Sequence, residues 1–299
     1  MAVTTSRRDL LHFCCGTAAT LGVSAVAGEL AAVRALAQPA SPVSNISKED
    51  LFYREDWFGE PWRKPETAVL IHGNDESSVV WFGWVPRMGR EFRLLRPDLP
   101  GFGQSKVPPG FEWSLPSLAA FIARVLDKAG VESAHIIGAK TGGAIAMQFA
   151  ADYPARTRTL AVASGPASVI VVSNPSSIPQ RDRLGSAASK EMIDYWNNMF
   201  AAAPEEGTKG LRTALSKFDL ARDGVLRRIT APTLVITADR SALQSVEKVR
   251  QYQLLIPNSR LVVLHSDAYH IAAANADECV TNVLAFIKDA KQRRGSENP

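Results

Sequence analysis

The chain has 299 residues, of which 46% are hydrophobic and 21% are charged. At ~100–200 residues per domain, this length allows one large domain or two small ones, and the apolar fraction excludes a disordered chain. Thirty-four Lys and Arg against 30 Asp and Glu leave a net charge of +4 without a basic block, so nucleic-acid binding is not expected. Three cysteines cannot build a disulfide framework in a chain of this length.

Residues 1–37 are predicted to be a signal peptide. Arg7 and Arg8 precede a long apolar stretch, which ends in the small-x-small pattern of a signal-peptidase site at Ala35-Leu36-Ala37. The paired arginines resemble the twin-arginine signal, which implies passage through the twin-arginine export machinery to the bacterial periplasm or beyond. The alternative is an N-terminal membrane anchor, although Glu29 and Arg34 interrupt the run of ~20 apolar residues that a stable span needs.

Residues 38–299 are predicted to form one α/β domain, in which short β-branched runs alternate with amphipathic stretches. The expected strands are Ala68–His72, Phe92–Pro97, Ala134–Gly138, Thr159–Ala163, Thr233–Thr237 and Arg260–His265. The expected helices lie near Leu118–Ala129, Ala144–Tyr153, Val246–Leu255 and Asp277–Lys291. This alternation favours a mainly parallel sheet that is flanked by helices on both faces.

The segment from about residue 165 to residue 229 breaks this alternation. It contains a polar, proline-marked loop at Ser173–Gln180 and amphipathic segments around Lys190–Phe200 and Thr208–Phe218. An insertion of this size after a strand is interpreted as a helical lid over the functional site.

Three short segments at the carboxyl ends of expected strands carry side chains that can do chemistry. They are His72-Gly73-Asn74-Asp75, Gly138-Ala139-Lys140-Thr141-Gly142-Gly143 and Asp267-Ala268-Tyr269-His270. Open parallel sheets bind their ligands at the carboxyl ends of strands, so we expect the three loops to converge on one cleft.

These segments, taken in chain order, resemble the α/β-hydrolase fold family over essentially the whole mature length. The matching landmarks are His72-Gly73, the run Pro97-Asp98-Leu99-Pro100-Gly101-Phe102-Gly103-Gln104-Ser105, the Gly138–Gly143 turn and the late His270. The resemblance implies the α/β-hydrolase fold and hydrolase-type chemistry on a small organic ester or carbonyl substrate.

The chain departs from the family at the residue that normally attacks the substrate. The family places a nucleophile at the apex of a tight strand-to-helix turn with the form Gly-x-nucleophile-x-Gly. Here the apex holds Lys140 in place of Ser, Cys or Asp, and Thr141 lies one position past it. A protonated ammonium has no lone pair for attack on a carbonyl, so the mechanism of a standard serine hydrolase is not expected.

Other parts of the family's catalytic machinery have matching residues. The resemblance implies that the backbone N–H groups of Asn74 and Thr141 form the oxyanion hole and that His270 is the base. The family's acid position falls on Ser241, which leaves Asp239, two residues earlier, as the candidate that orients His270.

The substrate pocket has three further candidates, Asp75, Trp81 and Trp196. Large aromatic side chains are core residues by default, so core packing is the alternative for both tryptophans. Asp75 and Glu76 are candidate partners of Lys140, and the alternative is that both are solvated surface charges.

Three roles for Lys140 remain open. A neutral, desolvated amine could form a Schiff base in a carbon–carbon lyase, or act as a general base. A protonated Lys140 could bind a carbonyl or anionic oxygen while His270 moves protons. Alternatively, an ion pair of Lys140 with Asp239 or Asp75 would leave a catalytically silent ligand-binding protein, because an unpaired buried charge costs several kcal/mol.

Among these roles, an exported hydrolase with Lys140 at the nucleophile position and His270 as acid and base is the preferred interpretation. No glycine loop follows a first strand in the dinucleotide-binding pattern, and no His/Cys/Asp cluster has metal-ligand spacing. We therefore expect no cofactor and no metal. The sequence does not identify the substrate or the oligomeric state.

Overall fold

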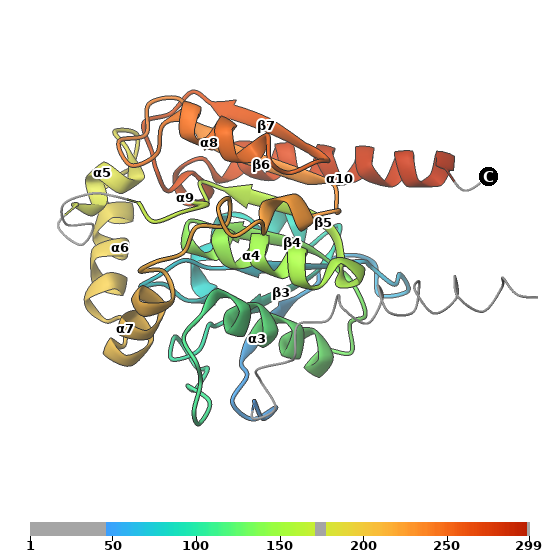
Figure 1. Cartoon of the computed structure of the whole chain (residues 1–299), viewed down its shortest axis with the longest axis horizontal. Helices are drawn as coiled ribbons and strands as arrows, with labels where there is room; N and C mark the ends of the chain where they lie inside the picture. Colours follow the sequence, from blue (N-terminus) through green and yellow to red (C-terminus); the bar gives the residue numbers. More distant parts are fainter. Residues whose placement is uncertain (1–45, 171–177, 298–299) are drawn as a thin grey trace, which may run out of the picture. The chain divides into compact units, whose positions relative to one another are not determined.

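A computed structural model describes residues 46–170 and 178–297 (Figure 1). The predicted signal peptide and most of the Ser173–Gln180 loop lie outside the described residues. Within the described part of the chain, every helix is too short or too polar to cross a membrane.

The core of the domain is a seven-stranded sheet with the order β1-β3-β2-β4-β5-β6-β7. Only β1 runs antiparallel to its neighbour; each other neighbouring pair is parallel. The strands are β1 (Tyr53–Asp56), β2 (Thr67–Ile71), β3 (Arg93–Pro97), β4 (Ala134–Ala139), β5 (Thr157–Ala163), β6 (Thr233–Ala238) and β7 (Ser259–Leu264). Each predicted strand is present, whereas β1 was not predicted.

Side chains alternate between the two faces of this sheet. Along β2, Val69 and Ile71 join one buried apolar cluster, while Ala68 and Leu70 join a second cluster on the opposite face. Successive side chains of a strand point to opposite faces, so a strand that is apolar at every position is buried on both sides. The sheet is therefore covered by helices on both faces.

The first cluster packs against α3 (Leu115–Lys128), α4 (Thr141–Asp152) and α8 (Val246–Gln253). The second packs against η1 (Ser78–Gly83), α2 (Val85–Met88), α9 (Ile271–Ala274) and α10 (Ala276–Glu297). Short 3₁₀ turns lie at η2 (Pro154–Arg156) and η4 (Leu226–Arg228). Ser114 and Ser245 cap α3 and α8, since each hydroxyl accepts a hydrogen bond from a backbone N–H in the first turn.

The chain between β5 and β6 forms the helices α5 (Gln180–Leu184), α6 (Lys190–Ala201) and α7 (Glu205–Ala214). These three helices lie together beside the sheet, at the left of Figure 1. Leu184 and Trp196 are buried in the second apolar cluster and Leu211 in the first, so this segment is packed onto the domain.

Candidate active site

Lys140 occupies the apex of a sharp turn between β4 and α4. Its backbone has φ +52° and ψ −127°, a left-handed conformation that costs a non-glycine residue of order 1–3 kcal/mol. The turn packs against backbone on two sides. A Cβ atom at Gly142 would lie 2.3 Å from the carbonyl oxygens of Ile71 and His72, so only glycine fits there. The turn thus presents the Lys140 side chain at the carboxyl end of the sheet.

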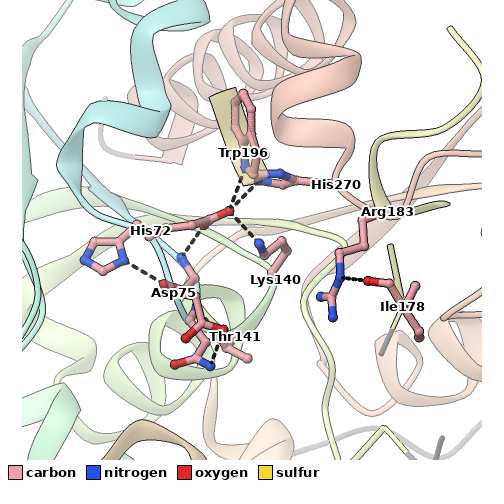
Figure 2. Close-up of polar contacts among 11 residues, drawn as sticks. His72, Asp75, Lys140, Thr141, Ile178, Arg183, Trp196 and His270 are labelled. Atoms are coloured by element: carbon pink, nitrogen blue, oxygen red, sulfur yellow. Dashed lines mark hydrogen bonds and ion pairs between the residues drawn. The ribbon is translucent and has the colours of Figure 1, made fainter. Parts of the chain in front are cut away.

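The ammonium of Lys140 is bound to a carboxylate. Its Nζ lies 2.5 Å from Oε1 of Glu76, and both side chains are buried. The second Glu76 oxygen, Oε2, accepts a hydrogen bond from the backbone N–H of Gly73 at 3.0 Å, and Trp196 donates its indole N–H to Oε1 at 3.2 Å. Glu76 therefore joins the β2 loop, the β4–α4 turn and helix α6. Figure 2 shows the Lys140, Trp196 and His270 side chains gathered at this point.

His270 reaches the same carboxylate from the last loop of the sheet. Its Nε2 lies 3.5 Å from Oε1 of Glu76, and its ring packs edge-on against Trp196 at a centroid distance of 5.3 Å. Its Nδ1 is buried without a hydrogen-bond partner among the described residues. Its backbone N–H donates to the carbonyl of Arg183 at 2.8 Å, which ties the histidine loop to α5.

Burial and charge set the protonation of this cluster. Burial alone would raise the pKa of Glu76, but the charge and hydrogen bond of Lys140, together with His270 and His72, outweigh it and lower that pKa to about 2. Burial lowers the pKa of Lys140 while the Glu76 carboxylate opposes that change. Burial and the nearby Lys140 charge lower the pKa of His270 to about 3. The cluster thus holds a close Lys140–Glu76 contact beside an imidazole that is neutral at neutral pH.

The predicted oxyanion-hole residues lie next to one another. The backbone N–H of Asn74 donates to the Thr141 hydroxyl at 2.7 Å, so this side chain satisfies one of the two predicted donors. Asp75 follows with φ +60°, and its carboxylate accepts hydrogen bonds from the Asn74 amide and the Thr208 hydroxyl. The Arg212 guanidinium lies 3.6 Å from the same carboxylate.

His72 has a structural role in this loop. Its Nδ1 donates to the carbonyl of Gly73 at 2.7 Å, and its Nε2 accepts from the backbone N–H of Leu99 at 2.9 Å. Both ring nitrogens of His72 are hydrogen-bonded, and its ring is buried against Phe102. His72 therefore holds the loop that follows β2 against the loop that follows β3.

A cavity of about 770 Å³ opens over the turn, within the ~300–1,000 Å³ range of small-molecule sites. Lys140, Thr141, Asn74 and Asp75 line its floor, and residues between β5 and β6 supply most of the remaining wall. The polar residues of that wall are Gln180, Arg183, Glu205, Thr208 and Arg212, with Tyr269 from the histidine loop. The three predicted loops thus meet at one cavity, which is lined by Asn74, Lys140 and Tyr269.

Three of the predicted site residues lie elsewhere than expected. Asp239 does not orient His270, because its carboxylate is bonded to His265 Nδ1 at 2.6 Å and to the backbone N–H of Ser266 at 2.9 Å. Trp81 does not line the cavity but packs in the core, edge-on to Trp84. Trp196 is also buried, and it contacts Glu76 and His270 behind the cavity wall.

Glu76, and not Asp75 or Asp239, is the partner of Lys140. The sequence predicted Glu76 only as one of two candidate partners, Asp75 and Glu76. Spacing along the chain does not show which of two adjacent carboxylates turns inward. Arg183 and Tyr269 were not predicted as cavity residues. Tyr269 was within reach of sequence reasoning, because it directly precedes His270 in the third loop.

Comparisons with known proteins agree with this architecture. Residues 67–183 match the family model described as the alpha/beta hydrolase fold. The enol-lactonase of Burkholderia xenovorans LB400 superposes with a TM-score of 0.69 at 21% identity, covering 80% of this chain and 96% of the lactonase. A hydrolase from Pseudomonas aeruginosa PA01 gives a TM-score of 0.69 at 25% identity, covering 83% and 99%. The chain has the α/β-hydrolase fold.

Relatives identified by sequence include an esterase, a depolymerase and a hydrolase. The pimeloyl-[acyl-carrier protein] methyl ester esterase of Aeromonas hydrophila is 40% identical over 99 residues, which are 33% of this chain and 37% of the esterase. The poly(3-hydroxyalkanoate) depolymerase of Ectopseudomonas oleovorans is 24% identical over 258 residues, which are 79% of this chain and 88% of the depolymerase. The 40% identity to the esterase therefore spans only 37% of the length of the esterase.

Proposed function

We propose that this chain is an enzyme of the α/β-hydrolase family that hydrolyses a small organic ester or related carbonyl compound. Its relatives are named for reactions on esters and lactones, and its cavity lies over the turn where the fold places its reactive group. The observation that carries the proposal is the Lys140 ammonium, which lines this cavity while Glu76 holds it.

Lys140 acts in this proposal as a hydrogen-bond donor and not as a nucleophile. An ammonium has three N–H donors, and the contact with Glu76 uses one of them. A donor fixed at the position of developing negative charge lowers the barrier to attack on a carbonyl. Because Thr141 already occupies the Asn74 N–H, the lysine replaces part of the usual oxyanion hole.

Water is the nucleophile in the proposed reaction. The oxygen of water attacks the carbonyl carbon, the bond to the alkoxy oxygen breaks, and one water proton passes through His270 to the leaving alkoxide. The imidazole of His270 is neutral at neutral pH and so has a lone pair for this proton, while its lowered pKa makes it a weak base. Schiff-base chemistry needs a neutral amine; burial lowers the pKa of Lys140 toward that form, and the Glu76 carboxylate opposes this change.

The proposal is tested with p-nitrophenyl esters of two to eight acyl carbons. We expect hydrolysis by the wild type without a stoichiometric burst of p-nitrophenolate, and a loss of at least 100-fold in kcat/KM in Lys140→Met and His270→Gln. Lys190→Met, on the exposed face of α6, is the matched control and should retain activity. A burst, or full activity in Lys140→Met, would refute the proposed role of the lysine.

A second candidate is a ligand-binding protein without turnover. Two observations favour it: the Lys140 charge is already neutralised by Glu76, and His270 is 2% exposed and does not line the cavity. This candidate predicts tight binding of small ligands by a protein that hydrolyses none of the esters tested.

We also propose that the protein is exported, with residues 1–37 acting as a cleaved twin-arginine signal. Support comes from Arg7-Arg8, the apolar stretch and the small-x-small site. The test is fractionation of a bacterium that expresses the full chain. Mature protein should appear in the periplasm for the wild type, and uncleaved precursor should remain in the cytoplasm for Arg7→Lys/Arg8→Lys.

A further inference from the structure

The Thr141 hydroxyl accepts a hydrogen bond but donates none to the described part of the chain. Its oxygen accepts from the backbone N–H of Asn74 at 2.7 Å, and this is the one hydrogen bond that the hydroxyl makes to a described residue. A hydroxyl has one hydrogen to donate besides its acceptor lone pairs. Thr141 can therefore donate to a ligand while it keeps its contact with Asn74.

This hydroxyl belongs to the same end of the cavity as the Lys140 ammonium. The two residues are neighbours in the chain, and both line the cavity. Thr141 is partly exposed, whereas Lys140 is 4% exposed. Thr141 is also the first residue of α4, where the helix dipole favours negative charge. Figure 2 shows the two side chains with Asp75, which lines the cavity as well.

The loop after β2 holds the Asn74 N–H against Thr141. Asp75 has φ +60°, and its carboxylate accepts hydrogen bonds from the Asn74 amide at 3.0 Å and from the Thr208 hydroxyl of α7 at 2.7 Å. These contacts keep the loop in its strained conformation. An N–H group that donates to a hydroxyl oxygen polarises the O–H bond and strengthens the hydrogen bond that the hydroxyl itself donates.

The surroundings of Thr141 suit a donor better than a nucleophile. A threonine that attacks a carbonyl needs a base that accepts its hydrogen, and no described residue accepts from this hydroxyl. His270 is 2% exposed, and its Nε2 lies 3.5 Å from Glu76. The Asp75 carboxylate accepts from the Asn74 amide and Thr208 instead.

We propose that the Thr141 hydroxyl is a catalytic hydrogen-bond donor, which relays the Asn74 N–H to the carbonyl oxygen of the substrate beside Lys140. The inference rests on the proposed function. As the oxygen of water bonds to the carbonyl carbon, the π electron pair of the carbonyl moves onto its oxygen. Thr141 and Lys140 donate to that oxygen, and neither gives up its proton. The side-chain hydroxyl thus takes the place of the Asn74 N–H in the oxyanion hole.

The first test compares Thr141→Val, which removes the hydroxyl and keeps the shape, with Thr141→Ser, which keeps the hydroxyl. With p-nitrophenyl butyrate we expect kcat to fall about 100-fold in Thr141→Val, because the donor acts on charge that develops in the transition state. The KM should change by less than about threefold, and Thr141→Ser should stay within about threefold of wild type. Thr213→Val, on the exposed face of α7, is the matched control and should retain activity.

The second test needs no turnover. The monoanion of methyl butylphosphonate has a tetrahedral centre with negatively charged oxygens, as the transition state of the proposed reaction does. In calorimetric titration we expect Thr141→Val to bind it about 10-fold more weakly than wild type, and Thr141→Ser to bind it as wild type does.

A wild-type kcat in Thr141→Val would overturn the inference. So would a raised kcat, because the hydroxyl would then be blocking the Asn74 N–H, and so would an acyl group on Thr141 in mass spectrometry. Thermal melting shows whether Thr141→Val is folded, and Thr141→Ala replaces it if it is not.

The two tests separate this inference from the proposed function. Phosphonate binding that depends on the hydroxyl, without hydrolysis of any ester, would refute the proposed function alone. Ester hydrolysis that is unchanged in Thr141→Val would refute this inference alone. Neither binding nor hydrolysis in wild type would refute both.

Discussion

The Nζ of Lys140 and the Oε1 of Glu76 are 2.5 Å apart in the interior of the domain, where their side chains are 6% and 0% exposed. This pair distinguishes the chain from hydrolases that attack with an oxygen or sulfur at the same turn. Burial lowers the pKa of Lys140, and the Glu76 carboxylate opposes that change by stabilising the ammonium. The proposed hydrolysis therefore assigns this pair, and not an attacking side chain, to the apex of the turn.

Breaking this pair from one side should destabilise the fold strongly. Lys140→Met leaves the Glu76 carboxylate buried without its cation, so we expect the free energy of unfolding to fall by about 3–5 kcal/mol. Lys140→Met/Glu76→Gln removes both charges and should recover much of that loss. Urea denaturation followed by circular dichroism measures both values.

The exposed pair of Lys190 and Asp194 is the matched control. Its contact is also 2.5 Å, but the lysine side chain is 84% exposed. Exposed pairs contribute about 0–1 kcal/mol, so Lys190→Met should cost no more than that. Equal losses in Lys140→Met and Lys190→Met would show that the Lys140–Glu76 pair contributes no more than a surface contact.

Restoring a serine at the apex should not restore a serine hydrolase. In Lys140→Ser the imidazole of His270 would still have Nδ1 without an orienting acid and Nε2 near Glu76. A serine that lacks an oriented base is not activated. We expect no labelling of Lys140→Ser by a fluorophosphonate probe above the level of Lys140→Ala. Stoichiometric labelling at residue 140 would show that His270 can act as an oriented base.

Stability should decrease as the pH falls from about 6.5 toward 3. The pKa values of buried His270 and His135 are lowered to about 3 and about 4, so the unfolded chain takes up protons that the folded chain refuses. Each histidine should contribute roughly 1.4 kcal/mol per pH unit within its window. Denaturation across pH 4–7 measures this slope. The slope should be smaller in His270→Gln. An unchanged slope in His270→Gln would contradict the neutral, buried state of that ring.

The turn itself should be intolerant of a side chain at Gly142. Gly142→Ala places a Cβ 2.3 Å from two backbone oxygens, so we expect a loss of at least about 2 kcal/mol of unfolding free energy. Gly295→Ala in α10 is the control, since its Cβ would meet no described atom within 4 Å and should be neutral or slightly stabilising. A neutral Gly142→Ala, measured by thermal melting, would mean that the turn can move away from the first loop.

Much of the fold could be predicted from the sequence because its central strands are buried on both faces. Runs such as Ala68-Val69-Leu70-Ile71 and Leu234-Val235-Ile236 are apolar at every position, and helical periodicity separates the strands. The strand β1 could not be predicted, since Tyr53-Arg54-Glu55-Asp56 is mostly polar and lies at the sheet edge. Its strand character comes from pairing with β3 and not from its own pattern.

The candidate site could be predicted only in part, for a similar reason. Glycine spacing placed Lys140 at the apex, and chain order brought His270 to the same end of the sheet. Sequence position could not show that Asp239 turns toward His265, or that Glu76 turns inward while Asp75 faces the cavity. Those directions depend on loop conformation, including the positive φ of Asp75, which no local pattern specifies.

The charge state of Lys140 is the central claim, and nitrogen NMR of the lysine side chains tests it most directly. The Lys140 Nζ signal is assigned by its absence in Lys140→Met and followed from pH 5 to pH 8. The ion pair with Glu76 predicts the chemical shift of an ammonium throughout this range, without a titration step. A neutral amine, or a titration midpoint of Lys140 below pH 7, would contradict the ion pair and would favour the Schiff-base lyase.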